Sequence, residues 1–146
     1  MRGAASAAAL STCLMASPAL AGDLSPLPEA LRQGADEHYM LVRCAGLYHS
    51  VLLYGGEAQL GPERTKDLEA RINLLMQMAA ALRMQLGIDP DAAGTQIMQE
   101  TSRIADLYVE RYHRNYAARG LPFTPDPVWD ADMETCREVM GATHVE

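Results

Sequence analysis

The chain has 146 residues, of which 49% are hydrophobic and 21% are charged, and its 19 acidic side chains outnumber 12 basic ones. These proportions are typical of one globular domain and exclude a disordered or fibrous chain. The net charge of −7 and the presence of a single lysine, Lys66, argue against nucleic acid or an anionic membrane surface as the partner, because both are bound through clusters of Lys and Arg.

Residues 1–21 have the pattern of a secretory signal peptide. Arg2 supplies a positive charge, residues 4–15 are uncharged and rich in Ala and Leu, and a small-residue cleavage site ends at Ala21. We therefore expect cleavage near Ala21 and export to the periplasm, or secretion. The apolar stretch is too short to cross ~30 Å of hydrocarbon, so no transmembrane span is expected. Lipidation of Cys13 at a lipobox-like sequence is the alternative.

The cysteine count predicts a disulfide. Cleavage would remove Cys13 and leave Cys44 and Cys136 as an even pair in an oxidising compartment. Free buried thiols are the alternative. Cleavage would also remove Arg2, which leaves 12 − 1 = 11 basic residues against 19 acidic ones.

The predicted fold class is all-α. Gly and Pro separate long segments of helical period, and runs of alternating β-branched and aromatic residues are almost absent. Residues 22–34 form a Pro-bearing lead with a short turn over 29–33. A single helical domain is expected over 35–146.

The first long helix is expected over residues 35–54, with Gly55 and Gly56 ending it. Its inward-facing stripe consists of Met40, Leu41, Cys44, Tyr48, Val51 and Leu52. Apolar residues also occur on the far side of this helix, where a surface helix is normally polar. This second set, a candidate interface, consists of His38, Val42, His49 and Leu53. Either the N-terminal lead covers it, or a second chain does.

The second helix is expected to begin at Pro62 and to end at Gly87. Its apolar side chains recur at steps of four and three residues, which is the spacing of a packed seam. This stripe consists of Leu68, Ile72, Leu75, Ala79, Leu82 and Leu86. Met76 and Met78 carry thioethers that suit copper(I), but on a helix they point about 200° apart, so we interpret them as core filling.

The third helix is expected to run from Pro90, capped by Asp89, to Arg119. One of its faces is largely apolar, and the opposite face is charged. The apolar face consists of Ile97, Thr101, Ile104, Ala105, Tyr108 and Tyr112.

Aromatic residues concentrate near the end of this helix and in the proline-rich connector over residues 121–127. They are Tyr108, Tyr112, Tyr116, Phe123 and Trp129. We interpret the tyrosines mainly as one layer of the core, with their hydroxyls at the rim of that core. The alternative is a binding patch, with a pocket between the third helix and the 121–129 segment.

The last helix is expected over residues 128–140. Its apolar stripe consists of Trp129, Met133, Cys136 and Met140. Because Cys44 and Cys136 both lie on inward-facing stripes, a bond between them would join the last helix to the first long one. Long helices joined by short turns favour a small antiparallel four-helix bundle.

Motifs that would identify a reaction are missing. Glu110 and His113 have the spacing of one half of a di-iron site, but the motif occurs once and lies on the polar side of its helix. The sequence contains no Gly-x-Ser-x-Gly elbow, no phosphate-binding glycine loop and no Cys-x-x-Cys-His. We therefore expect no catalytic residue, no metal and no cofactor.

The sequence thus predicts an exported helical protein with a protein-binding or structural role. Its partner is another protein or a second copy of the chain. In size class, acidic balance and single disulfide the chain is similar to periplasmic acid-stress chaperones of the HdeA kind, although it is longer and shares no motif with them. That resemblance implies an acid-responsive chaperone as one alternative. A carrier for a small ligand is the other.

Overall fold

The computed structural model describes residues 23–142, which are helical with no strand among them. The predicted signal peptide and Cys13 lie outside this range. The helices are α1 (Leu27–Arg32), α2 (Glu37–Leu60), α3 (Pro62–Gln85), α4 (Pro90–Arg119) and α5 (Pro127–Ala142). The expected all-α bundle is confirmed, and the turn expected near residues 29–33 is the short helix α1.

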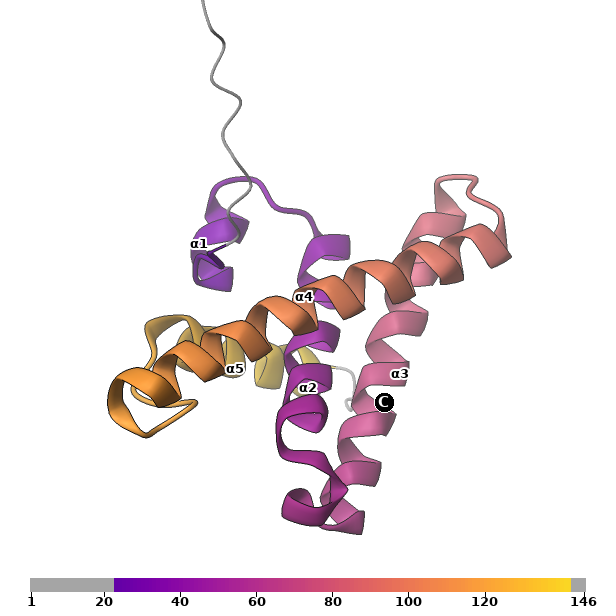
Figure 1. Cartoon of the computed structure of the whole chain (residues 1–146). Coiled ribbons are helices and arrows are strands. Elements are labelled where there is room, and N and C mark those ends of the chain that lie inside the picture. Colours follow the sequence, from indigo (N-terminus) through magenta and orange to yellow (C-terminus); the bar gives the residue numbers. More distant parts are fainter. Residues whose placement is uncertain (1–22, 143–146) are drawn as a thin grey trace, which may run out of the picture.

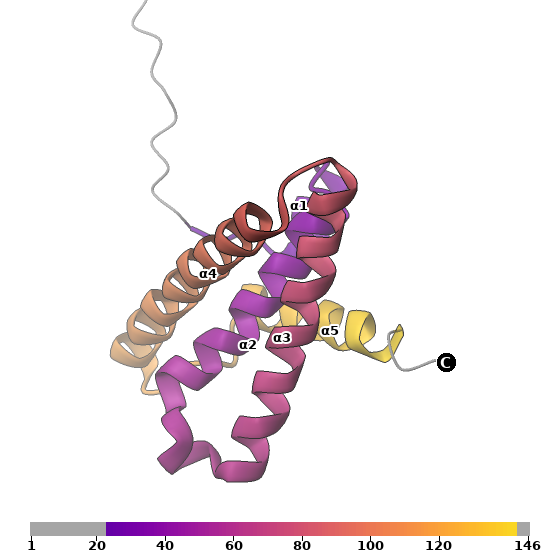
Figure 2. The ribbon, with the colours of Figure 1, turned by 90° about the vertical axis from the view of Figure 1, so that its right-hand side faces the viewer.

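The centre of the bundle is a hairpin of α2 and α3. Figure 1 shows these two helices side by side, with α4 running across them. In Figure 2, α5 crosses behind the hairpin, where it packs against α1 and α2. No helix within residues 23–142 is both long enough and apolar enough to cross a membrane.

Aspartate side chains set two of the helix starts. The Asp36 carboxylate accepts a hydrogen bond from the Tyr39 amide at 2.8 Å, so α2 begins at residue 37 and not at 35. Asp89 accepts hydrogen bonds from the amides of Asp91 at 3.0 Å and Ala92 at 3.2 Å. Pro90 then begins α4 as predicted.

The first long helix is interrupted at Gly56, as the glycine pair predicted, and a short second segment that was not predicted follows it within α2. Gly56 has φ 63° and ψ 167°, a non-helical backbone conformation that glycine adopts without a Cβ penalty, so the chain kinks here between two helical segments. A further turn continues to Leu60 and ends at Gly61, whose φ is 78°. The kink places Gln59 and Leu60 at the wall of a pocket.

The predicted core stripes are buried or partly buried, with one exception. The buried members of α3 are Leu68, Ile72, Leu75 and Ala79, and all six residues predicted for the α4 face are buried. Leu86 is 79% exposed, because α3 ends at Gln85 and Leu86 follows as its C-cap residue.

The close contact between α2 and α4 depends on Gly46. A Cβ atom at this position would lie 2.5 Å from Ile104 Cγ2 and 3.2 Å from the Thr101 carbonyl oxygen. Both distances are shorter than van der Waals contact, so a side chain here would force the helices apart.

The predicted disulfide is present between Cys44 of α2 and Cys136 of α5. Both residues are fully buried, and their Cα atoms are 5.4 Å apart. The bond therefore joins the last helix to the first long helix, across 92 positions of sequence.

Candidate functional site

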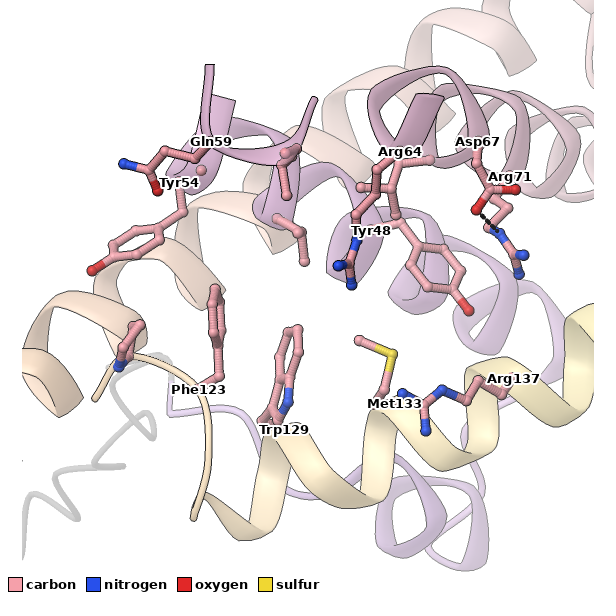
Figure 3. A pocket seen from close by; sticks show the side chains of 15 residues that line it. Tyr48, Tyr54, Gln59, Arg64, Asp67, Arg71, Phe123, Trp129, Met133 and Arg137 are labelled. Carbon is pink, nitrogen blue, oxygen red and sulfur yellow. Dashed lines mark hydrogen bonds and ion pairs between the residues drawn. The ribbon is translucent and has the colours of Figure 1, made fainter. Parts of the chain in front are cut away.

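The main concavity is a pocket of about 750 Å³ between α2, the first half of α3, the 120–126 connector and α5. This volume is in the range of small-molecule sites, ~300–1,000 Å³. Figure 3 shows side chains from these elements pointing into one space. Apolar and aromatic groups form most of the wall, and four charged side chains lie at its Tyr48 side.

A cluster of rings holds the aromatic part of the wall. The buried ring of Tyr112 lies behind it, with its centroid 4.9 Å from Phe123, 5.6 Å from Trp129 and 5.4 Å from Tyr54. The rings of Phe123 and Trp129 are 4.8 Å apart. The Tyr112 hydroxyl forms a 2.6 Å hydrogen bond with Ser50 Oγ. These contacts fix the rings of the wall before any ligand arrives.

Asp126 positions Trp129 by capping α5. Its buried carboxylate accepts bonds from Arg111 at 2.6 and 2.8 Å, from Asn115 Nδ2 at 2.5 Å and from the Val128 amide at 2.9 Å. Burial raises the pKa of Asp126, but the bonds from Arg111 and Asn115 and the charge of Arg111 outweigh burial and lower that pKa to about 2.

The lowered pKa of Asp126 predicts an acid-dependent loss of stability. A carboxyl whose pKa falls from 3.8 to about 2 on folding stabilises the folded state above pH 4, and this contribution is lost as the pH falls from 4 to 2. We expect Asp126→Asn to lower the free energy of unfolding by about 2 kcal/mol at pH 7, with a smaller difference from wild type at pH 2. Urea unfolding across this range measures it.

Asp106→Asn is the matched control, because Asp106 is exposed, and it should leave the dependence of the free energy of unfolding on pH unchanged. A constant difference between wild type and Asp126→Asn from pH 7 to pH 2 would contradict the assignment of the low pKa to Asp126.

A second buried carboxylate, Asp132, forms an ion pair with Arg43. Arg43 Nη2 lies 2.6 Å and Nε 3.0 Å from Asp132 Oδ2, and both side chains are almost fully buried. Asp132 Oδ1 accepts the Leu27 amide at 2.5 Å. The Tyr108 hydroxyl accepts from Arg43 Nε at 2.7 Å and donates to Asp132. Burial raises the pKa of Tyr108, which keeps this hydroxyl protonated.

The remaining donors of Arg43 are also used. Nη1 donates to the Tyr39 hydroxyl and Nη2 donates to the Ser25 carbonyl, both at 2.8 Å. The cluster thus joins the N-terminal lead, α2, α4 and α5. Neither Arg43 nor Asp132 lines the main pocket, so we interpret the pair as structural.

The four residues of the candidate interface do not form one exposed face. Val42 is 1% exposed and lies with Ile104 beside a second, smaller hollow. His38 lies 2.9 Å from the Glu100 carboxylate and 3.0 Å from Arg83, and His49 is half-buried. Only Leu53, 53% exposed, presents most of its side chain to solvent. Val42 is therefore covered by other residues of the same chain and not by a second chain.

The candidate aromatic patch divides into three parts. Tyr108 and Tyr112 are core residues, as the main interpretation has it, and Tyr116 is 58% exposed. Phe123 and Trp129 line the pocket. The pocket was expected between α4 and residues 121–129, but no α4 residue lines it. The Tyr112 ring packs on both Phe123 and Trp129 and so fills the space between α4 and the connector.

Sequence reasoning missed the basic part of the pocket. Arg64 and Arg71 lie beside the buried stripe of α3, four residues before and three residues after Leu68, and Arg137 follows Cys136 on α5. Arg64 and Arg71 are two helical turns apart on one side of α3, and the crossing of α5 near the α2–α3 hairpin brings Arg137 to them. Their spacing in the sequence carried no signal of the pocket.

Within residues 23–142 no group of three His, Cys, Asp or Glu side chains is placed to hold a metal ion. Comparison of the chain with protein-family models, with curated proteins and with solved structures finds no match.

Proposed function

We propose that this protein is an exported, non-catalytic binding protein that holds a small, largely apolar ligand in the pocket between α2, α3, α5 and the connector. The observation that carries the proposal is the pocket, whose volume is about 750 Å³ and whose aromatic wall is fixed by ring contacts. Sites of this kind, mostly apolar with a few polar groups, are typical of small-molecule binding.

The chemistry of the lining supports binding over catalysis. Among the described residues that line the pocket, none is His, Cys or Ser, and the single carboxylate, Asp67, pairs with Arg71 at 2.8 Å. Asp126 and Asp132 are both engaged in hydrogen bonds elsewhere, and both sulfurs of the cysteine pair are bonded. The described lining therefore lacks the Ser, Cys and His side chains that most often act as nucleophile or general base, and its one carboxylate is paired.

Export is supported by two independent features. Residues 1–21 read as a signal peptide, and a disulfide persists in the oxidising periplasm or outside the cell. The alternative roles, partner binding through α2 and acid-stress chaperone activity, stay predictions. Only Leu53 of the α2 set is mainly exposed, so fewer observations favour a docking surface there.

A fluorescence titration tests the proposal, because Trp129 is the only tryptophan of the chain and lines the pocket. We expect saturable 1:1 binding of the neutral probe N-phenyl-1-naphthylamine to the disulfide-bonded mature chain, with a change in Trp129 emission. Met133→Glu places a charge in the apolar wall and should weaken binding at least about tenfold.

Met98→Glu is the matched control, because Met98 is 56% exposed on α4 and does not line the pocket. Its affinity for the probe should equal that of wild type. Absence of saturable binding, or equal weakening by both substitutions, would refute the proposed pocket function.

A further inference from the structure

We infer that the ligand of this pocket is an anionic amphiphile, with an aromatic or aliphatic body and one terminal acidic group that lies between Arg64, Arg71 and Arg137. This inference rests on the proposed binding function and adds the chemical class of the ligand. Three observations carry it: the charge of the lining, the separation of its apolar and basic parts, and a buried hydroxyl at the basic part.

The lining is basic although the chain is acidic. Three guanidinium groups and one carboxylate line the pocket, a net charge of +2, while the whole chain carries −7. Asp67 pairs with Arg71. Arg64 and Arg137 form no ion pair within the described part of the chain, so their positive charge remains available to a ligand.

The pocket has an aromatic end and a basic end. Figure 3 shows the rings of Tyr54, Phe123 and Trp129 at one end, and Arg71 and Arg137 at the other. The Arg64 guanidinium points into the space between Trp129 and Tyr48 (Figure 3). A ligand with its apolar body against the aromatic rings would therefore place an acidic group among the guanidinium groups.

The Tyr48 hydroxyl supplies the third observation. Tyr48 is 3% exposed and lines the basic end, and its hydroxyl has no hydrogen-bond partner of normal geometry within residues 23–142. The Arg71 guanidinium carbon lies 5.9 Å from the centroid of its ring. Burial raises the pKa of Tyr48, against the opposing charges of Arg71 and Arg137 and the donor contact from Arg71, so the phenol stays protonated. Arg71 can only donate to this hydroxyl, so the O–H proton lacks an acceptor, which an acidic oxygen of the ligand would supply.

Two matched ligand pairs test the acidic group. Dodecanoate is compared with dodecan-1-ol, and 2-naphthaleneacetate with 2-naphthaleneethanol, each by displacement of N-phenyl-1-naphthylamine from the disulfide-bonded mature chain. We expect at least one acid to bind tenfold or more tightly than its alcohol, with a smaller preference at high salt. If the acid is preferred over the alcohol in the dodecyl pair, the ligand is lipid-like. If it is preferred in the naphthyl pair, the ligand is an aromatic acid.

Substitutions then locate the acidic group. The double variant Arg64→Gln/Arg137→Gln should reduce the preference for the acid over its alcohol to threefold or less. Tyr48→Phe keeps the ring and should weaken binding of the acid several-fold more than binding of the alcohol. The control Arg32→Gln/Arg119→Gln changes two exposed arginines outside the pocket and should leave the preference intact.

The outcomes separate the two proposals. Equal affinity of acids and alcohols, or a preference that survives the Arg64 and Arg137 substitutions, overturns the inference, and saturable binding of the neutral probe would then leave the binding function standing. Absence of binding of every probe overturns both.

Discussion

Asp132→Ala should destabilise the fold by about 3–5 kcal/mol, because it leaves the Arg43 guanidinium buried without its anionic partner. Both side chains are at most 1% exposed, and Asp132 also accepts hydrogen bonds from the Leu27 amide and from Tyr108. Typical domains have only ~5–15 kcal/mol of stability, so this single change should remove a large part of it. Urea unfolding at pH 7 measures the difference.

The exposed pair of Arg71 and Asp67 provides the comparison. Its N–O distance of 2.8 Å is also short, but the Asp67 side chain is 57% exposed. Because solvent screens such pairs, Asp67→Ala should cost less than about 1 kcal/mol. Equal effects of Asp132→Ala and Asp67→Ala would contradict the role assigned to the buried pair.

A double variant separates the pair from its parts. Arg43→Met/Asp132→Leu removes both charges and fills similar space, so it should be more stable than Asp132→Ala. A double variant as unstable as the sum of the single ones would show that Arg43 and Asp132 act independently.

The helices could be predicted because their signals are local. Capping by Asp89 and Pro90 and the period of the α4 face each depend on residues a few positions apart. The glycine pair at residues 55 and 56 is a local signal of the same kind, since a glycine with positive φ interrupts a helix. The short helical segment after Gly56, which ends at Leu60, was not predicted because it is too short to show a helical period.

The polar cluster and the pocket could not be predicted because their parts lie far apart in the sequence. Asp132 precedes Cys136 by four residues and so lies on the apolar stripe of α5, where a charged residue is a visible irregularity. Its partner Arg43 is 89 residues away, and no spacing rule connects them. The pocket likewise requires that α5 and the connector lie against the α2–α3 hairpin, a tertiary contact that periodicity does not specify.

Loss of the disulfide should lower the melting temperature by roughly 10–20 °C. In the chain-entropy model, closing a loop of 92 residues restricts the unfolded chain and contributes up to ~4.5 kcal/mol. Cys44→Ala/Cys136→Ala and chemical reduction should therefore both lower the temperature of unfolding, which circular dichroism measures. An unchanged melting temperature in the double variant would contradict this prediction.

Probe binding by the reduced protein shows whether the disulfide acts on the unfolded chain or on the folded one. The Arg43–Asp132 pair and the Asp126 cap hold α5 in place independently of the sulfurs. If the bond acts mainly on the unfolded chain, the reduced protein should still bind N-phenyl-1-naphthylamine at 25 °C with wild-type affinity, although it melts earlier. Loss of binding at that temperature would show instead that the bond is needed to keep Trp129 and Met133 at the pocket wall, because both lie on the helix that it joins to α2.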